Sequence, residues 1–226
     1  MADVVFEKRY DRNHPVLSEE DQQNLKRAKV LVIGCGGLGG YVIESLARIG
    51  VGNLTVADAD VFEVSNLNRQ LLSSEKNLGE SKAGAALKRV HDVNSEVNIE
   101  AIAERITDSN IAELLKNTDV IIDAVDNYKT RLLLAKAAGK AGVPLIHGAI
   151  AGWTARVYTL YPGDDMMEFF CAGDEVNFAG NLPFMAALCA SIQTAEAVKI
   201  LLGEGKNEKK LIEIDIKNNS FESVVL

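Results

Sequence analysis

The chain has 226 residues, enough for one α/β domain with a large core. Its formal charge of −8 argues against a nucleic-acid-binding protein, since the only dense basic cluster is the short segment 205–210. No apolar run reaches the length of a membrane span, and the first residues show no leader pattern. Three scattered cysteines, Cys35, Cys171 and Cys189, exclude a disulfide framework and predict a cytoplasmic protein.

Apolar and polar segments alternate along the chain and predict a regular succession of helices and strands. The expected helices cover residues 17–28, 37–50, 79–94, 108–117, 128–142 and 182–203. The expected strands cover residues 29–34, 53–58, 97–104, 119–127, 143–150 and 153–162, and a terminal pair in 210–226 joined by an Asn-Asn turn. Ser18 and Asp108 are the expected N-caps of the first and fourth helices, and Gly50 closes the second.

Strands that alternate with crossover helices are typical of a parallel sheet. We therefore predict an α/β fold: a Rossmann-like, doubly wound, mostly parallel sheet with helices on both faces and an antiparallel C-terminal extension. No linker is evident, so we interpret residues 1–226 as a single domain. Within it we distinguish an N-terminal helical arm (1–28), a nucleotide-binding core (29–150) and a last part with antiparallel strands, a crossover loop and the C-terminal helix (151–226).

A glycine-rich loop separates the first expected strand from the helix that follows it. Its sequence, GCGGLG, fits G-x-G-x-x-G in the strand–loop–helix context of a phosphate-binding loop. The loop residues expected to contact a nucleotide are Gly34, Gly36, Gly37, Leu38 and Gly39. Asp58 ends the next strand, about where an acid binds a ribose. These features alone also fit an NAD-dependent oxidoreductase.

The residues that follow favour ATP over NAD. The segment 58–72, DADVFEVSNLNRQLL, is rich in polar side chains, namely Asp60, Asn66, Arg69 and Gln70. Lys82 follows near the start of a helix, and cations there would neutralise a leaving pyrophosphate. Asp126 lies at the C-terminal end of an expected parallel strand, where a carboxylate suits magnesium shared with phosphate oxygens.

In these stretches the sequence resembles the ThiF/MoeB/HesA family, the bacterial relatives of ubiquitin-activating enzymes. The matching stretches are RYDRN, VLVIGCGGLGG, DADVFEVSNLNRQLL, GESKA, DAVDNYKTR, VPLIHGAI and SIQTAEAVKILLG. The resemblance implies an adenylyltransferase that uses Mg·ATP to join AMP to the C-terminal Gly-Gly of a small ubiquitin-like sulfur-carrier protein. Such activation, with release of pyrophosphate, would supply sulfur transfer for thiamine or molybdopterin-type cofactors.

The resemblance also implies roles for single residues. The residues placed around the nucleotide are Asp58, Asp60, Asn66, Arg69, Gln70, Lys82, Asp126 and Asn127. Asp58 would hold the ribose hydroxyls, and Asp126 would hold magnesium. Asn66 and Arg69 would contact phosphates, and Lys82 would bind the triphosphate. The residues expected to act in catalysis are Arg69, Lys82, Asp126 and Arg12.

Arg12 would act from the other subunit of a homodimer, by reaching the partner's γ-phosphate. Arg9 is a neighbouring candidate for that role. The chain also departs from the family in lacking two C-x-x-C pairs, so no zinc site is expected. The family's crossover-loop cysteine aligns with Val176, and the nearby Cys171 is either a displaced nucleophile or a free thiol.

Several features leave alternatives open. His147 is interpreted as structural rather than catalytic, and Trp153 either lines a groove for a carrier tail or packs in the core or a dimer. Cys189 is expected in the core and Cys35 behind the nucleotide. Other possible functions are adenylation of a small-molecule or peptide carboxylate, and a nucleotide-binding pseudoenzyme. The acidic balance counts against a tRNA-modifying member of the family.

Overall fold

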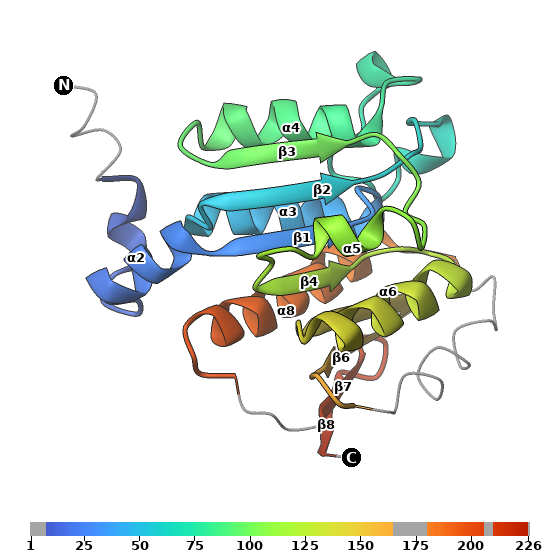
Figure 1. Ribbon diagram of the computed structural model, residues 1–226. Helices are drawn as coiled ribbons and strands as arrows, with labels where there is room; N and C mark the ends of the chain where they lie inside the picture. The colour runs from blue at the N-terminus through green and yellow to red at the C-terminus, as the bar shows by residue number, and fades with distance from the viewer. Residues whose placement is uncertain (1–7, 165–179, 206–209, 226) are drawn as a thin grey trace.

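The structure is a computed structural model that describes residues 8–164, 180–205 and 210–225 (Figure 1). The strands are β1 (Lys29–Ile33), β2 (Asn53–Ala57), β3 (Asn98–Ile102), β4 (Val120–Asp123), β5 (Leu145–Ala151), β6 (Thr154–Leu160), β7 (Lys210–Asp215) and β8 (Ser220–Val225). The α-helices are α2 (Glu19–Arg27), α3 (Gly37–Ile49), α4 (Lys82–Val93), α5 (Ile111–Leu114), α6 (Tyr128–Ala141) and α8 (Pro183–Leu201). Three short 3₁₀ helices are η1 (Lys8–Asn13), η2 (Val64–Asn66) and η3 (Glu75–Asn77).

All eight strands form one sheet in the order β3-β2-β1-β4-β5-β6-β7-β8. Strands β1 to β5 pair in parallel, whereas β6, β7 and β8 add antiparallel pairs. The predicted fold class is therefore confirmed. After β3 the chain returns to the other side of β1, so the strand order reverses between β1 and β4. Open α/β sheets place their ligands at this point, beyond the carboxyl ends of the strands.

Helices cover both faces of the sheet. Figure 1 shows α3, α4 and α8 on one face and α5 and α6 on the other. The strand β1 serves both layers: Val30 and Val32 belong to the core under α3 and α8, whereas Leu31 and Ile33 belong to the core under α6. This is why the parallel strands are continuous apolar runs rather than alternating ones.

Among the described residues, α8 is the one helix long and apolar enough to span a membrane by length and composition. In the fold it lies against α3, β5 and β6. Met185, Cys189 and Ala190 of this helix are fully buried. Its apolar side chains thus contribute to the protein core, and the expectation that Cys189 is a core residue is confirmed.

Local signals set most helix ends. Ser18 caps α2 with a capping box to Asp21, and Gly50 ends α3 in the left-handed conformation with φ of 97°. The expected Asp108 cap is wrong, because α5 begins at Ile111 and Asn110 occupies the N-cap position. Asn110 Oδ1 instead accepts the N–H of Thr107 at 2.8 Å, which closes the preceding turn.

Candidate active site

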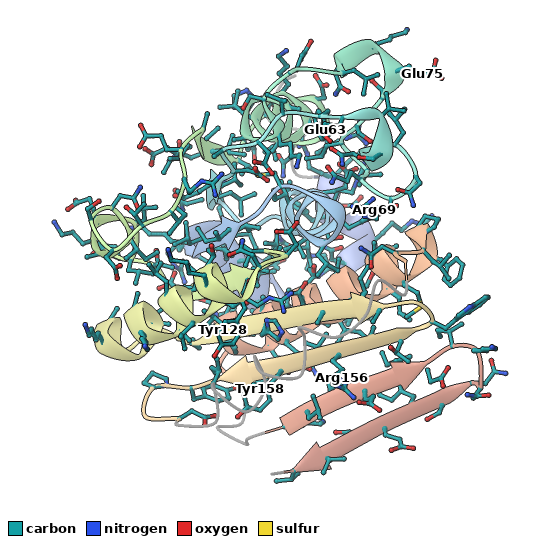
Figure 2. The ribbon with its side chains drawn as sticks, turned by 90° about the vertical axis from the view of Figure 1, so that its right-hand side faces the viewer. Glu63, Arg69, Glu75, Tyr128, Arg156 and Tyr158 are labelled. Carbon is teal, nitrogen blue, oxygen red and sulfur yellow. The ribbon has the colours of Figure 1, made fainter. Side chains whose placement is uncertain are left out.

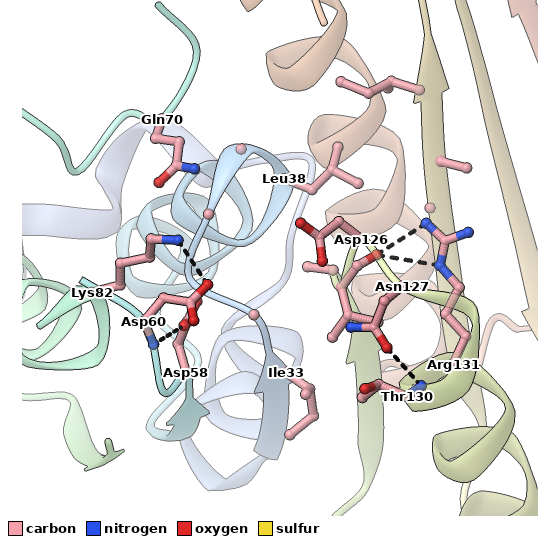
Figure 3. Close-up of a pocket in the computed structure, with 18 of the residues that line it drawn as sticks. Ile33, Leu38, Asp58, Asp60, Gln70, Lys82, Asp126, Asn127, Thr130 and Arg131 are labelled. Carbon is pink, nitrogen blue, oxygen red and sulfur yellow. Dashed lines mark hydrogen bonds and ion pairs between the residues drawn. The ribbon is translucent and has the colours of Figure 1, made fainter. Parts of the chain in front are cut away.

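A pocket of about 670 Å³ lies at the carboxyl edge of the parallel strands, where the strand order reverses. The loop between β1 and α3 lines the middle of this pocket. Figure 3 shows Asp58, Asp60, Gln70 and Lys82 on one side of it and Asp126, Asn127 and Arg131 on the other. The pocket therefore joins residues from three separate crossover connections of the sheet.

The glycine loop depends on two close backbone approaches. Gly34 has φ of +95°, and a Cβ there would lie 2.6 Å from the carbonyl oxygen of Ala124. At Gly39 a Cβ would lie 1.8 Å from the carbonyl oxygen of Gly34, so α3 packs directly on the loop. Because α3 begins at Gly37, the unpaired N–H groups and the positive dipole of its first turn lie at the pocket. This is an anion-binding arrangement.

Asp58 is tied to this loop by its carboxylate. Its Oδ2 accepts the N–H of Cys35 at 2.7 Å, and its Oδ1 accepts the N–H of Asp60 at 2.8 Å. Burial raises the pKa of Asp58, and these hydrogen bonds offset only part of the rise. The Cys35 side chain is fully buried, and burial raises the pKa of its thiol well above the ordinary value. Cys35 is therefore a protonated packing residue at neutral pH.

Lys82 forms a buried cation on the pocket wall. It opens α4, and its N–H donates to the Asp60 carbonyl at 3.0 Å. Its Nζ lies 3.2 Å from Asp60 Oδ2 (Figure 3). Main chain and side chain together thus fix the ammonium group in the site.

The turn before Arg69 and Gln70 is organised by Asn66. The Asn66 Oδ1 accepts the N–H of Glu63 at 3.0 Å, and its carbonyl accepts the N–H groups of Arg69 and Gln70. Asn66 is buried and does not line the pocket. It shapes the turn that brings the other two residues there. Arg69 Nη1 donates to the Ser65 carbonyl at 2.9 Å, which directs the guanidinium along the rim.

Asp126 presents a carboxylate to the pocket from the loop between β4 and α6. Within the described ranges this carboxylate has no hydrogen bond or ion pair, and the side chain is exposed. Next to it, Asn127 caps α6 by accepting the N–H of Thr130 at 2.9 Å. An available carboxylate that faces an anion-binding loop fits Mg²⁺, which proteins bind through one or two carboxylates together with phosphate oxygens.

The structure brings most of the predicted site residues together. Those that line the pocket are Gly34, Gly36, Gly37, Leu38, Asp58, Asp60, Arg69, Gln70, Lys82, Asp126 and Asn127. Gly39 and Asn66 do not line the pocket. Gly39 lets α3 pack on the glycine loop, and Asn66 shapes the turn before Arg69. Arg12 lies in η1 at the opposite end of the sheet from the chain's own pocket (Figure 1).

The two candidate arginines of the N-terminal arm differ in their surroundings. Arg9 donates to the Val93 carbonyl at 3.1 Å and to Asn94 Oδ1, so it fastens η1 to the end of α4. Arg12 is exposed, and no hydrogen bond or ion pair joins it to the described part of the chain. Arg9 therefore has a local structural role, whereas Arg12 projects outward.

Sequence reasoning missed several lining residues. They are Glu104, Arg105, Ile106, Thr130, Arg131, Ala149, Thr154, Arg156 and Asn181. Arg131 could have been found, because it lies one turn after Asn127 on a helix that starts at the site. Arg156 could not, because it comes from β6 (Figure 2) and only the antiparallel pairing places it there.

Other candidates have clearer surroundings. His147 lies within β5, which continues to Ala151. It is buried, and its Nδ1 lies 2.7 Å from Asp123 Oδ2. Trp153 is 45% exposed and packs on Phe184 with ring centroids 5.2 Å apart. The expectations for Cys171, and for Val176 as the aligned position, fall outside the described residues.

The sequence profile described as "ThiF family" matches residues 10–226. The chain belongs to the ThiF family. The SAMP-activating enzyme E1 of Haloferax volcanii is 37% identical over 96% of this chain and 84% of its own length. The sulfur carrier protein adenylyltransferase of Thermus thermophilus is 38% identical over 87% of this chain and 79% of its own length. The sulfur carrier protein ThiS adenylyltransferase of Bacillus subtilis is 36% identical over 81% of this chain and 57% of its own length.

Solved structures of this ThiF-family fold include MccB of E. coli. The structure of MccB with ATP has a TM-score of 0.80, is 26% identical in sequence, and corresponds to 96% of this chain and 70% of that chain. The structure of MccB with AMPCPP and MccA has a TM-score of 0.81 at 25% identity, over 96% of this chain and 71% of that chain. The fold of nearly the whole chain is thus shared with a protein whose structure contains ATP.

Proposed function

We propose that this ThiF-family chain is an Mg·ATP-dependent adenylyltransferase, a nucleotidyltransferase that activates a small ubiquitin-like sulfur-carrier protein. A carboxylate oxygen of the carrier's C-terminal Gly-Gly attacks the α-phosphorus of ATP. The bond from that phosphorus to pyrophosphate breaks, and the carrier's acyl-AMP forms. The activated carrier then serves sulfur transfer for thiamine or molybdopterin-type cofactors. The reaction takes place in a single domain, 1–226, of a cytoplasmic homodimer.

One observation carries this proposal: a cationic wall and an available carboxylate face each other across a glycine loop. Lys82 and Arg69 lie on one side of the pocket, and Asp126 lies on the other. A dinucleotide needs no such cations beyond its pyrophosphate, whereas a triphosphate releases a pyrophosphate whose charge must be neutralised. The names of the relatives, as adenylyltransferases of sulfur carriers, support the same reaction.

The chemistry requires positioning more than acid–base catalysis. A carboxylate is already a nucleophile, so no strong base is needed, and the rate arises from alignment and from stabilised charge. Lys82 is almost fully removed from water, which strengthens its attraction for phosphate oxygens. Arg69 adds a planar set of donors at the rim. Magnesium, when held by Asp126, supplies further neutralisation of the phosphates.

The homodimer part of the proposal concerns Arg12. This residue cannot reach its own pocket from the far end of the sheet, and it is exposed there. An arginine directed outward, on an arm fastened by Arg9, is suited to complete the pocket of a second copy. We therefore assign Arg12 to the γ-phosphate of ATP bound in the partner.

A second candidate function is adenylation of a peptide carboxylate. It is favoured by the likeness to MccB, one structure of which is a complex with MccA, at 25% identity over nearly the whole chain. In this case the pocket chemistry is unchanged and only the acyl substrate differs.

Exchange of radioactive pyrophosphate into ATP tests the proposal. Purified protein and Mg²⁺ are assayed alone, with candidate carriers ending in Gly-Gly, and with the same carriers lacking the last glycine. Exchange that requires the intact carrier is the expected result. Exchange supported by short peptides but by no carrier would instead establish the second function. ATP binding without exchange for any substrate would refute both.

A further inference from the structure

The peptide groups on both sides of Val125, the residue before Asp126, are held by side chains. The Val125 N–H donates to Asp123 Oδ1 at 3.1 Å. The Val125 carbonyl accepts from Arg131 Nη2 at 3.0 Å and from Arg131 Nε at 3.3 Å (Figure 3). On the other side of Asp126, Asn127 is fixed as the cap of α6. The backbone that carries the Asp126 carboxylate is therefore clamped at both ends.

Asp123 is itself held in place by contacts with residues of β5 and α8. It is fully buried in β4, and its Oδ2 lies 2.7 Å from Nδ1 of His147, its register neighbour on β5. Gln193 of α8 donates through Nε2 to the carbonyls of Asp123 at 3.0 Å and Ile146 at 3.2 Å. One carboxylate oxygen is thus used by His147 while the other orients the Val125 peptide.

Because the Asp123 carboxylate is buried, it needs all of its hydrogen-bond partners. A buried carboxylate is costly unless donors surround it, and removal of one partner leaves the other uncompensated. Apolar packing would serve stability at least as well. What the polar group adds is a defined direction for the Val125 peptide, and this direction sets where the Asp126 carboxylate points.

We propose that Arg131 and, through Asp123, His147 are positioning residues that fix the Asp126 carboxylate for magnesium. The inference rests on the proposed function, because it takes Asp126 as the magnesium ligand. Ligands must be held to within about half an ångström, and the residues behind them change metal affinity by about 10- to 100-fold. His147 lies outside the pocket lining, so its effect passes through Asp123.

Calorimetric titration with ATP, once in Mg²⁺ and once in EDTA, tests the proposal without turnover. The ratio of the two affinities measures the contribution of magnesium. We expect His147→Leu and Arg131→Met to lower this ratio about 10-fold. ATP affinity in EDTA should stay unchanged for His147→Leu, because His147 does not line the pocket. His147→Asn and Arg131→Lys keep a donor and should recover part of the loss. They also replace the first variants if those do not fold.

Arg89→Met is the matched control. It breaks the ion pair of Arg89 with Glu44, formed at 2.7 Å between α4 and α3, away from the pocket. It should lower thermal stability and leave the magnesium ratio unchanged. This control separates positioning of Asp126 from general loosening of the fold.

A double variant tests the route. If His147 acts through Asp126, then His147→Leu should have no further effect on the ratio in Asp126→Asn protein, whose ratio is already lost. An added loss in that background, or a wild-type ratio in both folded single variants, would overturn the positioning role. A wild-type ratio in Asp126→Asn alone would overturn it as well. A normal magnesium response without pyrophosphate exchange for any substrate would overturn the proposed function and leave the positioning role standing.

Discussion

Lys82 Nζ lies 3.2 Å from Asp60 Oδ2, yet the lysine side chain is 9% exposed and the aspartate side chain 62% exposed. The pair therefore consists of a buried cation and a carboxylate in contact with water. Phosphate oxygens entering the pocket can take the place of the carboxylate without exposing the ammonium group. The ion pair keeps a costly buried charge neutralised until an anion arrives.

The first prediction concerns Lys82. Lys82→Met should lower the rate of pyrophosphate exchange about 100-fold, because the protein loses a preorganised positive charge that neutralises the leaving pyrophosphate. Exchange rates and thermal unfolding are measured together. Lys88→Met on the same helix is the control, since Lys88 is 70% exposed and, among the described residues, forms an ion pair only with Glu80. Equal exchange rates in the two variants would contradict a role for Lys82 in the reaction.

The second prediction concerns Arg12. Arg12→Ala should lower turnover about 100-fold while ATP binding and the dimer persist, because the lost charge belongs to the partner's pocket. Mixing Arg12→Ala with Lys82→Met subunits should restore activity, since one pocket of each mixed dimer then has both residues. The assay is exchange after subunit mixing, with sedimentation to confirm the dimer. Mixtures as inactive as the separate variants would contradict a role across the interface.

The third prediction compares two glycines of the loop. Gly39→Ala should lower the free energy of unfolding by about 3 kcal/mol, because its Cβ would lie 1.8 Å from the Gly34 carbonyl oxygen. Gly37→Ala should be tolerated, because its nearest neighbour, Arg69 Cγ, is 3.7 Å away. Urea denaturation of both variants provides the measurement. Similar midpoints for the two would show that α3 does not pack on the loop as described.

The fourth prediction is a pH dependence of stability centred on Glu44. Burial raises the pKa of Glu44, but hydrogen bonds from Arg89 and Arg48 outweigh this effect and hold it below the ordinary value. A carboxyl group whose pKa is lowered by folding stabilises the protein above its unfolded pKa of about 4.3, and this contribution disappears as pH falls through the lowered value. Glu44→Gln should therefore destabilise at neutral pH and progressively less in acid.

Denaturation of wild type and Glu44→Gln over a pH series measures this difference. Glu80→Gln is the control, because the ion pair of Glu80 with Lys88 is exposed on both sides. Suppose that the stability difference between wild type and Glu44→Gln stays constant into acid. Hydrogen bonds from Arg89 and Arg48 then do not stabilise the ionised Glu44 carboxylate.

The parallel strands and the glycine loop could be predicted from the sequence, because their signals are local. Buried strands are short apolar runs, and a loop that must approach a neighbouring backbone needs glycine. Asp58, Lys82 and Asp126 followed from the same logic: Asp58 lies directly after β2, Lys82 begins α4, and Asp126 lies in the short loop between β4 and α6. The structure places all three on one pocket.

The support behind the site could not be predicted, because it depends on pairing between distant segments. The contact of His147 with Asp123 requires the register of β4 with β5, and that of Gln193 requires the placement of α8. The Asp108 cap was wrong for a related reason. Asp108 and Asn110 are both good capping residues, and sequence alone does not decide between sites two positions apart.

The two hydrogen bonds that Asp58 accepts, one from the β1–α3 loop and one from the segment after β2, have a thermodynamic consequence for ligand binding. Both its oxygens are oriented by N–H groups of Cys35 and Asp60 during folding, before any nucleotide enters. The side-chain entropy is therefore lost in the folding step, when the β1–α3 loop forms. A ligand with paired hydroxyl groups meets an acceptor that is already ordered, and more of its interaction energy is expressed as affinity.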